Sequence, residues 1–159
     1  MENLEDLKKK YEELGKEIER LENAENGGRV KEGRTYYYID DEGDIMSDSD
    51  YRYCTDTYRF EIGNYFRTES EAESALEKIK IYTKLKRLAD RLNVKDPISW
   101  RNEYQNKYYI RVNRNVNELG IDRNQYLQKQ GIIYCTDNNF LNIAKEEIGE
   151  EELKKLLID

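Results

Sequence analysis

Apolar residues near the start of the chain recur with the spacing of a helix that meets a partner surface. Between residues 4 and 21 they are separated alternately by three and four positions, and Lys and Glu fill most of the other places. This is the a/d pattern of three coiled-coil heptads, and it predicts an amphipathic helix within residues 1–27. The seam, which we treat as a candidate oligomerisation face, consists of Leu4, Leu7, Tyr11, Leu14, Ile18 and Leu21.

An isolated helix of about 20 residues is marginal in water, so this one needs a partner. The partner surface could belong to a second copy of the chain or to another part of the same chain, and the sequence leaves both alternatives open. In a parallel dimer the flanking positions would pair as Asn3 with Lys8, Lys10 with Gly15, and Glu17 with Glu22. None of these pairs attracts and the last repels, while a glycine costs about 1 kcal/mol of helix propensity. The pattern therefore disfavours a parallel zipper and leaves an antiparallel pair or intramolecular packing.

Two later segments share one plan, in which a hydrophobic strand is followed by a capping threonine and a helix. The first runs from residues 65–68 into a helix over 69–93, and the second from residues 133–136 into a helix over 137–148. Counted from Thr68 and Thr136, apolar residues fall at +4, +7 and +8, which is the stripe a helix needs to lie on a sheet. These residues are Ala72, Ala75 and Leu76 in the first copy, and Phe140, Ile143 and Ala144 in the second.

The remaining pattern completes two modules. In the first, residues 35–39 and a return strand from residue 45 flank an acidic turn in which Gly43 can take a positive φ, and alternation over residues 51–62 predicts a further strand. In the second, we expect a hairpin of residues 98–104 and 107–113, a short helix from Asp122 to residue 130, a strand over 132–135 and a terminal helix over 150–157. The predicted fold class is α+β: an N-terminal coiled-coil-like helix (1–27) followed by two antiparallel-sheet-plus-helix modules (28–95 and 96–159).

Composition narrows the chemistry. The chain has no His, which removes the commonest general base and transition-metal ligand, and only two Cys, which cannot form a four-thiolate zinc site. We interpret Cys54 and Cys135 as small buried apolar residues rather than a disulfide. No apolar run approaches 18 residues and no signal peptide is evident, so we expect a soluble, cytosolic protein with no membrane partner. The chain has fourteen Tyr but only three Phe and one Trp, so we expect tyrosine rings to supply much of the aromatic packing.

Charge is distributed unevenly. The chain carries a net charge of −7, yet residues 78–114 contain eleven Lys or Arg against three Asp or Glu. Within this segment Lys80, Lys84, Arg87 and Arg91 are spaced 4-3-4, which places them on one helix face, and Trp100 follows. Cations interleaved with aromatic rings suit single-stranded nucleic acid. The alternative is a solvated helix face beside a tyrosine-rich sheet.

An acidic turn is the second charged feature, and it consists of Asp40, Asp41, Glu42 and Asp44. It lacks the Asp-x-Asp-x-Asp-Gly order and the closing Glu of a calcium loop, so we expect no metal there. The turn is either simply solvated or a phosphate mimic that enters the basic channel of a partner. No carboxylate pair has diagnostic spacing and the glycines form no phosphate loop, so we predict a non-enzymatic protein without a cofactor.

Four features of the sequence occur together: the Leu-x-x-Leu opening of the N-terminal helix, residues 36–40 with Gly43, residues 59–68 with 71–73, and the ending at 133–134 and 148–151. In these features the chain resembles a family of small phage and prophage proteins from low-GC Gram-positive bacteria. It departs at residues 116–130, at Cys135 and at residues 138–139. Since this family offers no catalytic motif, the resemblance implies context only: an accessory protein in the host bacterial cytosol.

That context gives two functional hypotheses. The first is a non-enzymatic inhibitor that blocks a host anti-phage defence complex, above all a CRISPR effector nuclease, through the acidic turn or the basic stripe. In this hypothesis the N-terminal helix supplies homodimerisation or a docking surface. The second is a single-stranded nucleic-acid-binding accessory of phage replication or recombination that uses the basic stripe and Trp100.

Overall fold

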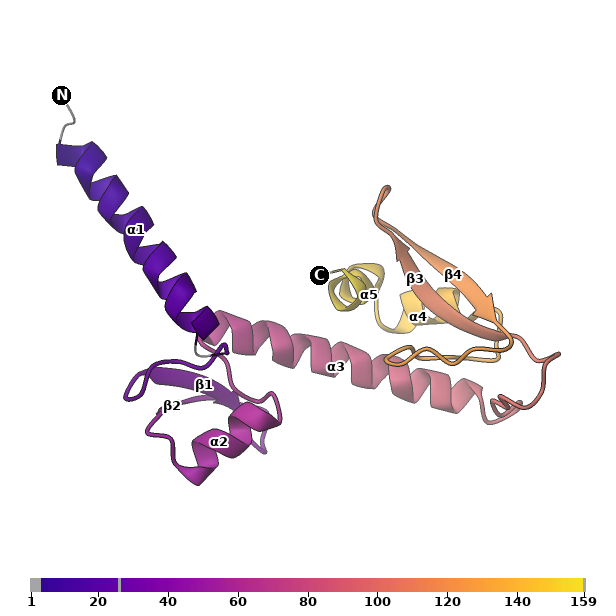
Figure 1. Ribbon diagram of the computed structural model, residues 1–159. Helices are drawn as coiled ribbons and strands as arrows, with labels where there is room; N and C mark the ends of the chain where they lie inside the picture. Colours follow the sequence, from indigo (N-terminus) through magenta and orange to yellow (C-terminus); the bar gives the residue numbers. More distant parts are fainter. Residues whose placement is uncertain (1–3, 26, 159) are drawn as a thin grey trace. The chain divides into compact units, whose positions relative to one another are not determined.

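The computed structural model describes residues 4–25 and 27–158, which form an α+β structure (Figure 1). Within those residues there are five helices and two two-stranded antiparallel sheets. In chain order the elements are α1 (Leu4–Glu25), β1 (Thr35–Ile39), β2 (Ile45–Ser49), α2 (Cys54–Glu61), α3 (Glu69–Leu92), β3 (Lys107–Asn113), β4 (Glu118–Asn124), α4 (Phe140–Glu147) and α5 (Glu150–Leu157). The predicted fold class and the long N-terminal helix are confirmed. Residues 1–3 and Asn26, which the predicted range 1–27 includes, lie outside the described residues.

Contacts divide the chain into two compact units, Met1–Leu76 and Glu77–Asp159, so that α3 contributes to both. The predicted three-part division at residues 27 and 95 stays a prediction. The units are described separately below.

In the first unit, β1 and β2 form the expected hairpin, with Thr35 opposite Ser49 and Ile39 opposite Ile45. The turn is held by Asp40, whose Oδ1 accepts hydrogen bonds from the backbone N–H groups of Glu42 (3.0 Å) and Asp44 (2.9 Å). Gly43 has a φ of 84°, which a side chain would strain. The acidic turn therefore has a local structural cause.

A third extended segment joins this hairpin and leads into α3. Tyr37 and Phe66 exchange both backbone hydrogen bonds at 2.8 Å, and the Asn64 amide donates to and accepts from the backbone of Ile39. Thr68 then accepts the Glu71 N–H at 3.2 Å. The Thr68 cap and the helix of the first copy are confirmed, but the strand before them is limited to a single bridge at Phe66.

The predicted strand over residues 51–62 is wrong, because residues Cys54–Glu61 form helix α2. Arg52 has a φ of 63°, which interrupts the extended chain before the helix. Asp56 then accepts the N–H groups of Tyr51 (3.1 Å) and Tyr53 (3.0 Å), donors that the start of a helix would otherwise leave unpaired. The alternation of apolar residues was misleading because a charged residue, not an apolar one, points inward.

In the second unit, β3 pairs with β4 rather than with residues 98–104, so two predictions here are wrong. Ile110 lies opposite Ile121 and Tyr109 opposite Asp122. Residues 98–104 form turns, fastened by the Gln105 side chain, and Asp122 belongs to a strand instead of starting a helix. Leu119 and Ile121 lie on the same face of β4, because side chains two residues apart in a strand point the same way. The helix prediction overlooked this alternation.

The second copy of the repeat is only partly confirmed. Residues 132–135 form no strand beyond a single bridge, in which Tyr108 and Cys135 exchange backbone hydrogen bonds at 2.7 and 2.8 Å. Thr136 does not cap a helix, because its N–H and hydroxyl donate to the Asn93 side chain and to the Asp96 carbonyl, and α4 begins at Phe140. The predicted apolar face of this helix is nevertheless confirmed, since Phe140 and Ala144 are fully buried.

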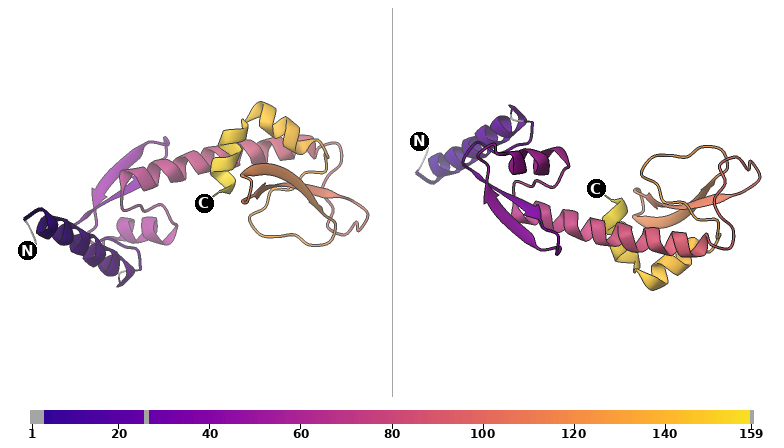
Figure 2. Two further views of the ribbon diagram at one scale, coloured as in Figure 1. Left: turned by 90° about the horizontal axis from the view of Figure 1, so that it is seen from above. Right: turned by 90° about the horizontal axis from the view of Figure 1, so that it is seen from below.

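The hydrophobic core of the second unit lies between α3, the β3–β4 hairpin, α4 and α5 (Figures 1 and 2). Its buried members are Leu85, Leu88, Ala89, Ile110, Leu119, Cys135, Phe140, Ala144 and Leu153. The terminal helix occupies Glu150–Leu157 as predicted. Both cysteines are free, as expected; Cys135 is buried, but Cys54 is exposed on α2, so its predicted burial is wrong.

Candidate functional surfaces

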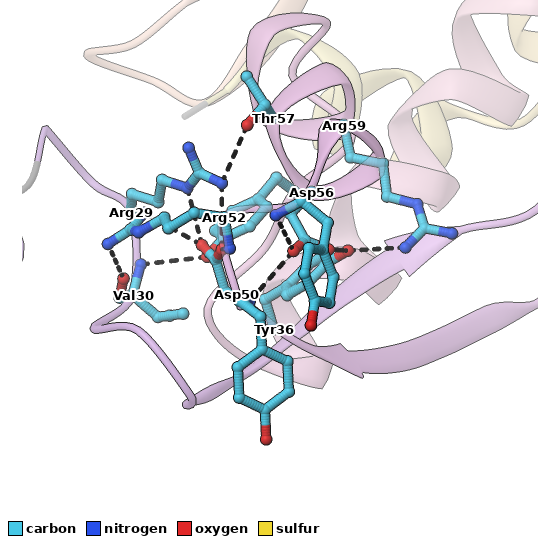
Figure 3. Close-up of polar contacts among 11 residues, drawn as sticks. Arg29, Val30, Tyr36, Asp50, Arg52, Asp56, Thr57 and Arg59 are labelled. Atoms are coloured by element: carbon cyan, nitrogen blue, oxygen red, sulfur yellow. Dashed lines mark hydrogen bonds and ion pairs between the residues drawn. The ribbon is translucent and has the colours of Figure 1, made fainter.

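The most constrained chemistry in the chain is a buried ion network in the first unit, which the sequence did not predict (Figure 3). Asp50, directly after β2, is fully buried. Arg29 binds both of its carboxylate oxygens, with Nε 2.7 Å from Oδ2 and Nη2 3.0 Å from Oδ1. Tyr65 Oη donates to Oδ2 at 2.7 Å, and Arg52 contributes its backbone N–H at 2.9 Å and Nη1 at 3.2 Å.

A second carboxylate extends this network across the hairpin to α2. Asp56 is 2% exposed and accepts the Tyr36 hydroxyl at 2.8 Å, in addition to the two N–H groups at the start of α2. Arg59 Nη1 donates to that same hydroxyl at 2.6 Å, and its guanidinium carbon lies 3.4 Å from the centroid of the Tyr38 ring. Tyr36 also stacks on Tyr65, with ring centroids 4.3 Å apart.

These surroundings shift the pKa values of Asp50 and of the two tyrosines beside it. Burial alone would raise the pKa of Asp50, but the hydrogen bonds from Arg29, Tyr65 and Arg52 outweigh it and hold that pKa below its usual range. Burial raises the pKa of Tyr36 to about 12, with Arg59 opposing and Asp56 reinforcing the rise. Burial and the bond to Asp50 raise the pKa of Tyr65 as well.

The network stabilises the first unit through hydrogen bonds and ion pairs, in the place where other domains have apolar packing, and it does not form a reactive site. Every buried side-chain nitrogen and oxygen among the described residues has a hydrogen-bond partner. Neither Asp50 nor Asp56 retains an oxygen that is free to act as a base, so the arrangement fixes α2 and the 29–30 segment on the hairpin. The available sequence signal was Asp56 at the third position of a helix, where a carboxylate reaches back to the preceding N–H groups.

At the acidic turn, the structure brings three of the four predicted residues together. Oxygens of Asp40, Glu42 and Asp44 all lie within 4.8 Å of one another, while Asp41 is exposed beside them. Because Asp40 is already engaged by the turn, the cluster follows from the hairpin geometry.

The basic stripe is brought together on one face of α3. Lys80, Lys84 and Arg87 are exposed, and none has a hydrogen-bond or ion-pair partner within residues 4–25 and 27–158. Arg91 differs, because it is paired with Glu147 of α4. Leu85 and Leu88 of the same helix are buried in the core of the second unit.

Trp100 does not join the stripe. Its ring packs edge-on against Tyr134 with centroids 4.9 Å apart, and Tyr109 packs against the same tyrosine. Lys107 is fully buried beside it, where Nζ donates to the carbonyls of Asn102 (2.9 Å) and Gln125 (3.1 Å). Trp100, which suggested base stacking, is therefore part of a small aromatic cluster with Tyr109 and Tyr134.

The six seam residues of α1 are all exposed in the described chain. None of the described helices combines the length and the apolar character that crossing a bilayer requires.

Comparison of the sequence with protein-family models, with curated proteins and with solved structures finds no match. The function is therefore inferred from the surfaces described above.

Proposed function

We propose that this chain is a non-enzymatic inhibitor that binds and blocks a host anti-phage defence complex, with a CRISPR effector nuclease as the first candidate. The observation that carries the proposal is the stripe of Lys80, Lys84 and Arg87, three exposed cations on one helix face without partners in the described chain. The resemblance to phage accessory proteins supplies the biological setting.

The stripe supports the proposal better than the acidic turn does. In α3 the three charges stand on a helix anchored by buried leucines, so a partner meets them in a fixed arrangement. In the turn, Asp40 already accepts two backbone hydrogen bonds. A positively charged helix face fits an anionic surface, such as a guide RNA or an acidic protein patch, by charge complementarity.

Two charge-reversal variants test the proposal and serve as controls for each other. One carries K80E, K84E and R87E; the other carries D41K, E42K and D44K and keeps Asp40, which the turn needs. Wild-type chain should restore phage plating on a strain defended by a CRISPR effector and should be recovered with that effector. We expect the α3 variant to lose both activities and the turn variant to keep them. The reverse result would move the contact to the acidic turn, and failure of the wild type against every defence system of its host would overturn the proposal.

The same stripe keeps single-stranded nucleic acid binding as a second candidate. Each phosphate that a cation contacts contributes about −0.7 to the slope of log affinity against log salt, so three contacts predict a slope of roughly −2. Fluorescence anisotropy of a labelled oligonucleotide measures this slope directly. A slope near −2 that disappears in the α3 variant would favour this candidate, while negligible binding at low salt would remove it.

A further inference from the structure

We infer that α1 is an antiparallel dimerisation helix whose partner is α1 of a second copy of this chain. In the described chain each of the six seam residues is between 47% and 81% exposed, so the chain's own body leaves most of the seam open to solvent, although Ile18 lines a pocket with Val30 and Tyr37. A helix of this length is marginal alone, and burying the seam would supply the missing stability. This inference does not depend on the proposed function.

The seam matches itself when reversed. If two α1 helices run antiparallel with their midpoints level, each apolar residue meets an apolar residue, and the pair has the two-fold symmetry of an isologous interface. The layers pair Leu4 with Leu21 of the second copy, Leu7 with Ile18, and Tyr11 with Leu14.

Flanking charges select this orientation. In the antiparallel arrangement Lys10 lies beside Glu17 of the second copy, and symmetry repeats that attraction on the other side. In the parallel arrangement Glu17 would instead lie beside Glu22 of the second copy, twice. Antiparallel packing also aligns the two helix dipoles favourably.

Gly15 gives an independent reason. A Cβ at this position would meet nothing within 4 Å, so no close contact inside the described chain requires a glycine there. In the antiparallel pair, Gly15 of the second copy lies within about 1.5 Å of the height of Tyr11, one residue's rise along the helix. The missing side chain therefore leaves room for the largest side chain of the seam.

Six seam residues per helix make a small interface, so we expect a dimer with a micromolar dissociation constant. Sedimentation equilibrium of the full chain should show a mass that rises with concentration from 19.1 kDa towards twice that value. Leu14→Glu, which places a carboxylate in a central layer, should hold the mass at that of a monomer. A wild-type chain that stays monomeric at several hundred micromolar, or an L14E variant that dimerises normally, would overturn the inference.

Charge exchange then tests the orientation. Glu17→Lys should raise the dissociation constant about tenfold, because two attractions become two repulsions. Adding Lys10→Glu should restore wild-type affinity, and Glu13→Lys, a matched reversal away from the seam, should leave the affinity unchanged. In a parallel dimer E17K would instead tighten association, by attracting Glu22, and that result would overturn the antiparallel assignment. Circular dichroism of each variant checks that α1 remains helical, since Glu17 also pairs with Arg20.

Discussion

Asp50 is the residue on which the first unit depends most. Its side chain is fully buried, yet Arg29, Arg52 and Tyr65 together supply donors to both carboxylate oxygens. A buried carboxylate is tolerated only when paired and hydrogen-bonded in this way, and removal of one partner leaves uncompensated charge.

Replacing Asp50 by Asn should therefore be costly although the side chains have nearly the same shape. It leaves the Arg29 guanidinium without its carboxylate, so we expect the free energy of unfolding at pH 7 to fall by about 3 kcal/mol. Urea denaturation followed by circular dichroism measures this loss. Asp48→Asn is the matched control, because Asp48 is exposed and its ion pair with Arg59 is long, at 3.3 Å. Equal effects of the two substitutions would contradict the structural role of the network.

Tyr36 predicts a pH dependence of stability at the alkaline end. Its folded pKa, about 12, lies above the ordinary value of 10, so the folded state holds this proton more tightly than the unfolded state. The stabilisation is therefore complete below pH 10 and is lost as the pH rises from 10 towards 12. Urea midpoints measured across this range should fall in the wild type.

Tyr36→Phe should remove this component and destabilise the fold at neutral pH by about 1–3 kcal/mol, since one oxygen of buried Asp56 loses its donor. Tyr38→Phe is the control on the same strand, because its hydroxyl bonds to no described residue and its ring can keep the contact with Arg59. A Y36F variant as stable as Y38F would show that the hydroxyl contributes nothing.

At the scale of elements, the two units use the same device to attach a third extended segment. In the first, the Asn64 side chain bonds both backbone groups of Ile39 at 2.8 and 2.7 Å. In the second, Asn93 accepts the Thr136 N–H and donates to the Tyr134 carbonyl. In each case the side-chain amide of an asparagine makes the backbone hydrogen bonds that a neighbouring strand would otherwise make.

Asn64→Ala should therefore loosen the end of β1 without unfolding the unit. We expect a loss of about 1–2 kcal/mol for the two hydrogen bonds, and faster hydrogen exchange at the Ile39 amide in particular. Exchange at the Tyr37 amide, which bonds to the Phe66 carbonyl instead, is the internal reference. Uniform acceleration of both amides would argue for general destabilisation.

Helix α2 explains why one element was assigned incorrectly. Sequence patterns assume that apolar residues face inward, and here Asp56 does so while Tyr58 and Ile62 remain exposed. The amphipathic rule works for α3 and α5 because they pack on an apolar core. It fails for α2 because the surface beneath it is polar.

At the scale of the whole molecule, the two units are stabilised by different physics. The first depends on an ion network around Asp50, and the second on the apolar cluster around Phe140 and Leu153. Acid should distinguish them. Because the folded pKa of Asp50 is below its unfolded value, its contribution is complete well above pH 4 and is lost as the pH falls through the lowered pKa.

We therefore expect acid to weaken the first unit more than the second. Trp100, the only tryptophan of the chain, packs on Tyr134 and reports the second unit by fluorescence. Between pH 7 and pH 3 the urea midpoint seen by Trp100 should move less than that seen by amide resonances of β1. Glu150 also has a lowered pKa, from bonds to Lys145 and Lys154, but it is largely solvated and should contribute little. A larger shift at Trp100 would contradict this division.

The sequence by itself determined the features that local patterns encode. The periods of α1, α3 and α5, the hairpin around Gly43 and the Thr68 cap could all be predicted, because neighbouring residues along the chain are sufficient to specify them. The stripe of Lys80, Lys84 and Arg87 belongs here too, since spacing alone places these residues on one face.

Only the tertiary structure decided which residues meet across long separations. Arg29 and Asp50 are 21 residues apart and Tyr36 and Asp56 are 20 apart, and no periodicity connects them. The partner of β3, the burial of Lys107 and the removal of Trp100 from the basic stripe depend on the same kind of contact. A buried charge is stable only beside its counter-charge, and the fold alone brings the two together.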